Sequence, residues 1–400
     1  MISSFAFVLA AITARAVATS NSDDIAIPPG AVYIDPLTYD VLGPNSTWYA
    51  ARNTSSSTVG FNPTNSTPPF IQVFDPSFLS ILGPSPTFRL IASNPGFAFA
   101  HEAPIYDAGN NLLFFSSNDG GPLGYNGWYN NSVVSYLNMT EVDEAITAAG
   151  TGADVNVQIT TLNLSDTVQM VNGGTGLYKG NLLFVTSGRA LLPPSIVLVN
   201  PNPPYNTTVL LDNFFGRQFN SLNDVKILPG TDIIFFTDPT YGYINKFRPE
   251  PMMPSQVYRF DPSTGQVRVI ADQFTEPNGV AFTPDGRTAF VTDTGGGTIT
   301  STIYQFDVDP ATQSFTNRRV FAYADSGAPD GIQLDTMGNV YAGCGEGTHV
   351  WNPEGTLIGK FYLNSTTAEM MFTQSGLVIL DEERMYLVDI VARGMNLGTL

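Results

Sequence analysis

The predicted fold follows from residues 276–294, which read Glu-Pro-Asn-Gly-Val-Ala-Phe-Thr-Pro-Asp-Gly-Arg-Thr-Ala-Phe-Val-Thr-Asp-Thr. A polar residue, Asn278, precedes a short apolar strand at 280–282, and a second strand follows at 288–292. Between them lies Pro284-Asp285-Gly286, in which proline presets φ and glycine accepts a positive φ. Such a tripeptide between two apolar runs predicts a β-hairpin, here with a polar residue at its entrance.

The same hairpin pattern recurs along the chain. The polar residues that begin the copies are called the entrance residues below. They are Glu102, Asn172, Asn223, Asn278 and Asp330, spaced 70, 51, 55 and 52 residues apart, and a degenerate sixth copy begins near Ala368. A period near 50 residues with several short strands per unit is typical of a β-propeller. The sequence therefore predicts an all-β protein, a six-bladed β-propeller.

The entrance residues form a candidate site, because equivalent positions of propeller blades face one central channel. Glu102, Asn223, Asn278 and Asp330 all carry side-chain oxygens, and two carboxylates with two amide carbonyls suit a hard cation such as Ca²⁺. The alternative is that these residues only form turns, but they precede the strands rather than lie in the turns. The repeat thus predicts a calcium site, with another divalent cation as an alternative.

The composition indicates a globular chain with many turns. Of the 400 residues, 43% are hydrophobic, and the chain contains 37 Gly and 29 Pro. The net charge of −18 argues against nucleic acid and anionic membrane surfaces as partners. A single domain of this length is common among large all-β folds.

The N-terminal residues predict a secreted protein. Residues 1–18 contain an apolar run from Phe5 to Ile12 and small residues that suit signal-peptide cleavage. Residues 19–95 are irregular and include a stretch rich in Ser, Thr, Asn and Pro. We expect them to form an N-terminal extension packed on a propeller that spans residues 96–400.

Eight Asn-x-Ser/Thr triplets support the prediction of a secreted glycoprotein. They begin at Asn45, Asn53, Asn65, Asn130, Asn138, Asn163, Asn206 and Asn364. Cys344 is the only cysteine, so no intrachain disulfide can form, and we expect a buried thiol. Residues 140–150 predict one short helix with Thr140 as its cap.

Other hydrolase classes are not indicated. The two histidines, His101 and His349, cannot make a three-histidine zinc site, and no Gly-x-Ser-x-Gly elbow occurs. His349 lies in a strand pattern and is expected to be structural. The candidate substrate-binding residues are His101, Asn172, Asp224 and Tyr241, each of which could equally be a blade-end hydrogen-bonding residue.

Residues 102–350 resemble the SMP-30/gluconolactonase/regucalcin family of six-bladed propellers. The resemblance rests on Asn223-Asp224-Val225, Phe236-Thr237-Asp238-Pro239, Pro277-Asn278-Gly279-Val280 and Pro329-Asp330-Gly331-Ile332. It is closer to the secreted fungal lactonohydrolases, which open aldonolactones and D-pantolactone, at residues 205–208, 215–224, 341–345 and 349–353. One departure concerns Ser221, because some family members carry a substrate-binding Arg at this position.

The resemblance implies a calcium-dependent lactonase. The family's metal ligands correspond to Glu102, Asn223, Asn278 and Asp330, which the repeat also selects, and its presumed catalytic base corresponds to Asp330. The metal would polarise the lactone carbonyl, and Asp330 would take a proton from the attacking water. Direct attack by Asp330 as a nucleophile is an open alternative.

Two other functions remain open. The same site could serve an organophosphatase or arylesterase, or the propeller could bind calcium or a ligand without turnover. The presence of both Glu102 and Asp330 favours an enzyme. A small-molecule lactone is the partner that the sequence indicates.

Overall fold

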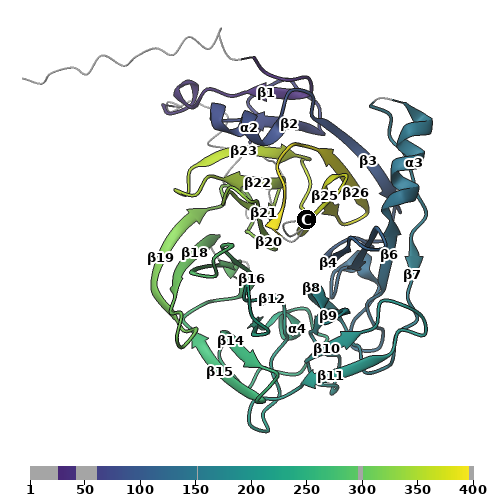
Figure 1. Ribbon diagram of the computed structural model, residues 1–400, viewed down its shortest axis with the longest axis vertical. Helices are drawn as coiled ribbons and strands as arrows, with labels where there is room; N and C mark the ends of the chain where they lie inside the picture. The colour runs from purple at the N-terminus through teal and green to yellow at the C-terminus, as the bar shows by residue number, and fades with distance from the viewer. Residues whose placement is uncertain (1–25, 42–60, 151, 296–300, 396–400) are drawn as a thin grey trace, which may run out of the picture.

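The computed structural model describes residues 26–41, 61–150, 152–295 and 301–395. Six sheets surround a central axis (Figure 1), so the protein is a six-bladed β-propeller, as predicted. The expected signal peptide, residues 1–18, lies outside the described residues. None of the helices in the described part of the chain has the length and apolar character needed to cross a membrane.

Each blade contains four antiparallel strands that are hydrogen-bonded in order from the axis outward. The innermost strands are β4 (Glu102–Asp107), β8 (Val171–Tyr178), β12 (Val225–Ile227), β16 (Pro277–Phe282), β20 (Ile332–Leu334) and β24 (Glu369–Thr373). The second strands are β5 (Leu112–Ser116), β9 (Asn181–Thr186), β13 (Ile234–Asp238), β17 (Thr288–Asp293), β21 (Val340–Cys344) and β25 (Gly376–Asp381). The third strands are β6 (Val134–Asn138), β10 (Ser195–Val199), β14 (Gln256–Asp261), β18 (Thr302–Val308), β22 (Gly347–Trp351) and β26 (Arg384–Asp389). The outermost strands are β7 (Thr160–Thr161), β11 (Thr207–Leu211), β15 (Gln266–Ala271), β19 (Phe315–Tyr323), β23 (Leu357–Tyr362) and β3 (Thr87–Ser93).

The hairpin predicted at residues 276–294 is formed by β16 and β17. Val280 pairs with Val291, and Phe282 pairs with Ala289. In the turn, the Gly286 amide donates to the Thr283 carbonyl at 2.9 Å, and Gly286 has a φ of +65°. Glycine is favoured here because other residues adopt this conformation at a cost in free energy.

The hydrophobic core lies between the blades rather than at the axis. Six clusters of buried apolar side chains each join two neighbouring blades in the described part of the chain. A strand in such a blade is covered on both faces, so its sequence is a continuous apolar run rather than an alternating one. For example, all six residues of β25 are buried.

The propeller includes more of the N-terminal residues than expected, because its start was predicted at residue 96. Strand β3 pairs with β26, from the other end of the chain, and completes the last blade. Strands β2 (Phe70–Val73) and β1 (Ala31–Tyr33) extend the fifth blade outward from β23. The propeller therefore begins before residue 96, because its last sheet lacks an outer strand without β3.

The helices are few and short in the described residues. They are α2 (Leu79–Leu82), α3 (Met139–Ala149), α4 (Tyr241–Ile244) and the 3-10 turns η2 (Pro36–Thr38), η3 (Pro76–Phe78) and η4 (Pro122–Gly124). The helix expected at 140–150 is α3, but its cap is Asn138, whose side chain accepts from the Thr140 amide. Asparagine is a stronger cap than threonine, which explains the earlier start.

The triplet asparagines lie mostly at the surface. Asn65, Asn130, Asn163, Asn206 and Asn364 are exposed, Asn138 is half-buried, and Asn45 and Asn53 lie outside the described residues. Their glycosylation and the secretion of the protein stay predictions. Cys344 is buried and free, as expected.

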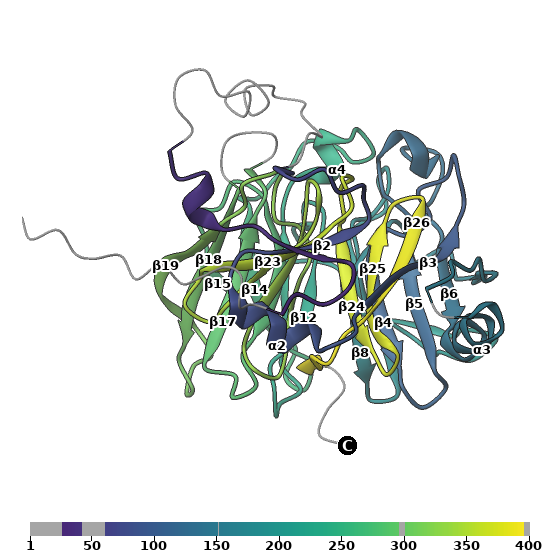
Figure 2. The same cartoon turned by 90° about the horizontal axis from the view of Figure 1, so that it is seen from above.

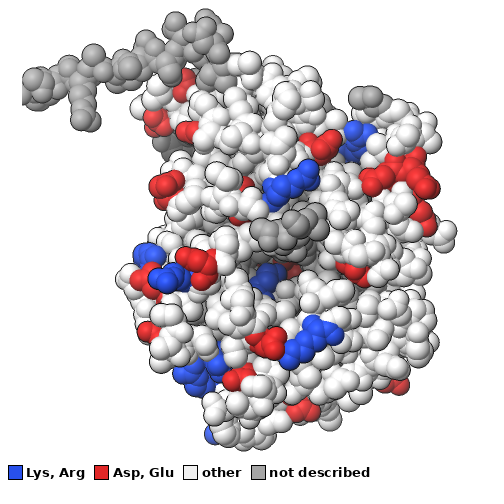
Figure 3. Space-filling view, in the orientation of Figure 1, with Lys and Arg blue, Asp and Glu red and all other residues white. Residues whose placement is uncertain are grey.

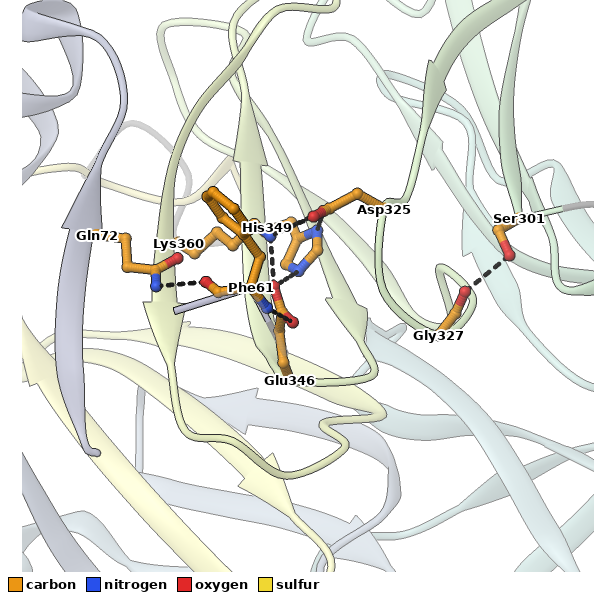
Figure 4. A network of polar contacts seen from close by, with 8 residues as sticks. All are labelled: Phe61, Gln72, Ser301, Asp325, Gly327, Glu346, His349 and Lys360. Carbon is orange, nitrogen blue, oxygen red and sulfur yellow. Dashed lines mark hydrogen bonds and ion pairs between the residues drawn. The ribbon is translucent and has the colours of Figure 1, made fainter. Parts of the chain in front are cut away.

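An ionic network lies within the fifth blade (Figure 4). The ammonium of Lys360 is 2.8 and 3.0 Å from the two carboxylate oxygens of Asp325 and also contacts Glu346. The ring nitrogens of the buried His349 lie 3.6 Å from Asp325 and 3.5 Å from Glu346. The Phe61 amide donates to Glu346 at 2.8 Å, so the network also fastens the N-terminal extension to the blade.

Candidate functional site

The entrance residues all lie at one end of the innermost strands. Glu102 is the first residue of β4, Asn172 and Asn278 are the second residues of β8 and β16, and Asn223 and Asp330 precede β12 and β20 by two residues. Helix α4, which Figure 2 shows at one end of the propeller, lies at this end too. The amide of Thr240, which directly precedes α4, donates to Glu276, directly before β16, at 2.6 Å.

The structure brings together three of the predicted site residues. Ligand atoms of His101, Glu102 and Asp330 all lie within 4.8 Å of one another. Asn278 is also close enough to lower the pKa of Asp330. Glu102, Asn223 and Asn278 are 3–4% exposed, and Asp330 is half-buried. The site is therefore a compact, largely desolvated group of oxygens.

Unpaired oxygens in this group fit a bound cation. Among the described residues, Asn223 Oδ1, Asp330 Oδ1 and Asn172 Oδ1 are buried without a hydrogen-bond partner. Leaving a buried acceptor unpaired costs about 1–3 kcal/mol, so several such oxygens in one site need an explanation. A hard divalent cation provides one, because it binds carboxylate and amide oxygens directly.

The two carboxyl groups of the site, those of Glu102 and Asp330, both have a raised pKa. Burial raises the pKa of Glu102 well above its ordinary value, and the charges of Asp330 and Glu369 raise it further. Burial also raises the pKa of Asp330, against the opposing effect of His101, to about 6. A bound cation would have to displace protons from these groups, so its affinity is expected to fall as the pH falls.

The metal-free protein is expected to lose stability as the pH rises from 5 to 8. The pKa is raised by burial to about 6 in Asp330 and to about 7 in Glu369, Asp238 and Asp381. The folded chain then binds more protons than the unfolded chain in this window, and raising the pH favours unfolding. Thermal melts in EDTA should give a higher melting temperature at pH 5 than at pH 7.5.

A second observation bears on the same prediction. Carboxyl groups with a lowered pKa, such as Glu346 and Glu382, are ionised above pH 5 in both the folded and the unfolded chain. They therefore do not make the stability depend on pH in this window. Added Ca²⁺ should reduce the loss between pH 5 and 7.5. A melting temperature in EDTA that rises with pH across this window would contradict the prediction.

His101 is held at the edge of the site by a carboxylate. Its Nδ1 lies 2.7 Å from Glu382 Oε1, and Asn118 donates to the other oxygen of Glu382 at 3.0 Å. Burial lowers the pKa of His101, but the charge of Glu382 outweighs burial and raises the pKa to about 9. The structure thus places the predicted substrate residue His101 beside Glu102 and Asp330, as a cation at neutral pH.

Tyr241 also lies at the site. Its hydroxyl contacts Thr294 Oγ1 and hydrogen-bonds to Asn278, and burial together with the charge of Asp330 raises its pKa. Ser221, which replaces the Arg of some family members, accepts from the Gly242 amide at 2.9 Å and so fixes helix α4. Tyr241 can therefore contact a substrate, whereas Ser221 positions the helix that carries it.

Asp224 makes the blade-end hydrogen bonds that were the alternative to substrate binding. Its two oxygens accept from the amides of Val225 at 2.7 Å and Val280 at 2.8 Å, so the carboxylate links β12 to β16. Lys226 Nζ lies 3.6 Å from it. These partners use Asp224 to join two blades rather than to line a substrate pocket.

Several charged residues near the site were missed by the sequence reasoning. The carboxylate of Glu369, from the sixth blade, packs against Gly331. A Cβ on Gly331 would lie 2.2 Å from this carboxylate. Asp119 and Glu382 lie in loops outside the repeat. Only Glu369 left a signal, since it follows Ala368 at the start of the degenerate copy.

A cavity of about 170 Å³ lies at the opposite ends of the innermost strands. Its lining includes Ile105, Lys226, Phe282, Gln333 and Met371, and none of the entrance residues. Figure 3 shows the surface hollowed near the axis. The cavity therefore lies at the other end of the innermost strands from the candidate site.

The chain matches known proteins over the region of the site. The family model described as the SMP-30/gluconolactonase/LRE-like region matches residues 158–380, which include every entrance residue except Glu102. Lactonohydrolase oryL of Aspergillus oryzae is 29% identical over 318 residues, covering 73% of this chain and 67% of that protein. A gluconolactonase of Zymomonas mobilis is 31% identical over 159 residues, covering 38% of this chain and 44% of that protein.

Solved structures show the same fold. A gluconolactonase from Xanthomonas campestris matches with a TM-score of 0.62 and 21% identity, covering 80% of this chain and 93% of that chain. Regucalcin from Agrobacterium tumefaciens, a calcium-binding protein, matches with a TM-score of 0.55 and 15% identity, covering 76% of this chain and 94% of that chain. At these identities the structural matches establish the architecture.

Proposed function

Because the chain belongs to the SMP-30/gluconolactonase/LRE-like family, we propose that it is a calcium-dependent lactonase that opens sugar-type lactones, such as aldonolactones and D-pantolactone, to hydroxy acids. Glu102, Asn223, Asn278 and Asp330 would hold the cation. The observation that carries this proposal is the group of buried, unpaired oxygens at these positions, which include Asn223 Oδ1 and Asp330 Oδ1. Regucalcin, which shares the fold, is a calcium-binding protein and supports the choice of ion.

The residues of the site have separate tasks in the proposed reaction. A cation bound by the four residues would polarise the lactone carbonyl and stabilise negative charge on its oxygen. Asp330 accepts a proton from the water that attacks the carbonyl carbon. The ring C–O bond then breaks, and the leaving alkoxide takes this proton from Asp330. One water is consumed, and a hydroxy acid is released.

The surroundings of Asp330 support its role as the base. Against the effect of burial, His101 and Asn278 both lower the pKa of Asp330, which favours the ionised form that a base requires. A carboxylate has two oxygens, so one of them can bind the cation while the other receives the proton. A lactone is an activated ester, so a base of moderate strength is sufficient.

Removal of the metal is expected to abolish hydrolysis. In a pH-stat assay, purified protein should release acid from D-pantolactone or D-glucono-1,5-lactone, and EDTA should stop the release. Calcium in excess of EDTA should restore it, because the carbonyl is no longer polarised without the cation.

Two outcomes would contradict the proposal. Hydrolysis that is indifferent to EDTA would exclude the metal. An absence of hydrolysis of both lactones by calcium-loaded protein would exclude the lactonase, and phenyl acetate and paraoxon would then test the arylesterase and organophosphatase alternatives.

A further inference from the structure

Asn172 is the entrance residue to which the proposed function gives no task. Its place in the ring can be compared with that of a proposed ligand, Asn278. A Cβ on Gly173 would lie 2.3 Å from the backbone oxygen of Asn223, and a Cβ on Gly279 would lie 2.6 Å from the backbone oxygen of Asp330. In both cases the residue after the asparagine packs against the next entrance residue. Asn172 is therefore placed relative to Asn223 as Asn278 is relative to Asp330.

The amide of Asn172 has a fixed orientation. Its Nδ2 donates to both carboxylate oxygens of Asp119 at 3.1 Å. The reverse orientation would direct the amide oxygen at a carboxylate, which accepts hydrogen bonds but has none to give when ionised. Both side chains are buried, Asn172 to 3% exposure and Asp119 to 6%. Asn172 Oδ1 is consequently turned away from Asp119, and it has no partner within the described part of the chain.

This orientation suits a cation. Since Nδ2 donates to Asp119, the atom that Asn172 leaves without a partner is an acceptor oxygen. A hydroxyl of a substrate could donate one hydrogen bond to this oxygen. A divalent cation, in contrast, requires oxygen ligands, and Ca²⁺ takes six to eight of them.

We propose that Asn172 is a fifth protein ligand of the cation and that Asp119 is the residue that positions it. The inference rests on the metal site of the proposed function and extends it. It moves Asn172 from the predicted substrate-binding set to the metal centre. It also gives Asp119 a task, since residues that orient a metal ligand affect the affinity for the metal.

Calcium titration by isothermal calorimetry, with the full chain freed of metal, tests the inference. Asn172→Leu removes the oxygen at similar volume, and we expect the calcium Kd to rise by at least the roughly 10- to 100-fold that loss of a ligand-orienting residue costs. Asp119→Ala leaves Asn172 in place but lets it rotate, so the Kd should rise by a smaller factor. The exchange variant Asn172→Asp/Asp119→Asn restores an oxygen ligand and its amide donor, and should bind calcium more tightly than Asn172→Leu.

Asn339→Leu is the matched control. Asn339 is also a buried asparagine that donates to a buried aspartate, Asp335 at 2.7 Å, but it lies in the turn between β20 and β21, away from the entrance residues. This variant should lower the melting temperature and leave the calcium Kd within twofold of the wild-type value.

The outcomes separate the inference from the proposed function. A folded Asn172→Leu or Asp119→Ala variant with the wild-type calcium Kd would overturn the inference alone, and a raised KM in that variant would return Asn172 to the substrate pocket. Wild-type protein that binds no calcium would overturn the metal site and the inference together.

Discussion

Replacement of Asp330 by asparagine is expected to lower kcat for lactone hydrolysis by about 10³-fold, within the range that general-base catalysis contributes. The substitution keeps an oxygen for the cation and removes the proton acceptor. It also removes the negative charge of Asp330, which raises the pKa of Glu102 in the folded protein, so calcium will bind more weakly. The assay therefore has to be run at calcium concentrations that saturate the variant, as judged by calorimetry.

Asp335→Asn provides the control for Asp330→Asn. Asp335 is buried just after β20, at the other end of the strand that Asp330 precedes, and its carboxylate accepts from the amides of Met337 and Asn339, both at 2.9 Å. We expect this variant to be less stable but to retain kcat, because Asp335 lies outside the site. A calcium-saturated Asp330→Asn variant with kcat within tenfold of the wild-type value would show that another group is the base.

Isotope labelling with the wild-type protein separates the two routes left open for Asp330. In a single turnover in ¹⁸O-labelled water, a base mechanism places the labelled oxygen in the product carboxyl group at once. A nucleophilic Asp330 would pass one of its own unlabelled oxygens to the product in the first turnover.

Much of the fold could be predicted because a propeller repeats one local pattern. The hairpin at residues 276–294 depends on neighbours in sequence, and Pro284-Asp285-Gly286 carries enough information to locate its turn. The closing strand β3 could not be predicted in this way. It pairs with β26, almost 300 residues away, and its partner is determined by which sheet edge remains free when the ring closes.

The residues of the candidate site also differ in whether the sequence could predict them. Glu102, Asn223, Asn278 and Asp330 could be selected because they occupy repeated positions. Asp119 and Glu382 could not, because each reaches the site from a loop whose path follows no repeat. For Asp224 the sequence left substrate binding and blade-end hydrogen bonding equally open. Its hydrogen bonds to Val225 and Val280 become visible only when β12 and β16 are adjacent.

Replacement of Lys360 by methionine is expected to destabilise the fold by about 3–5 kcal/mol, the usual consequence of removing one partner from a buried ion pair. Lys360 is fully buried, and its ammonium forms ion pairs with both Asp325 and Glu346. Although burial opposes ionisation of Glu346, its contacts with His349 and Lys360 hold its pKa well below the ordinary value. Without the ammonium, two carboxylates and a neutral histidine remain, and folding must either bury uncompensated charge or take up protons. Denaturant unfolding measures the loss.

The pH dependence of that loss distinguishes a missing charge from a packing defect. In the methionine variant the pKa values of Asp325 and Glu346 should rise above their unfolded values, so the variant gains stability relative to the wild type as the pH falls from 7 to 4.5. A cavity or poor packing around the new side chain would give a deficit independent of pH. Lys179→Met, which removes an exposed partner of Asp232, should produce no measurable change, and a second substitution of Glu346→Gln in the Lys360→Met background should recover part of the stability. If the loss at pH 7 is small and does not vary with pH, the network does not hold the fifth blade and the N-terminal extension together through charge.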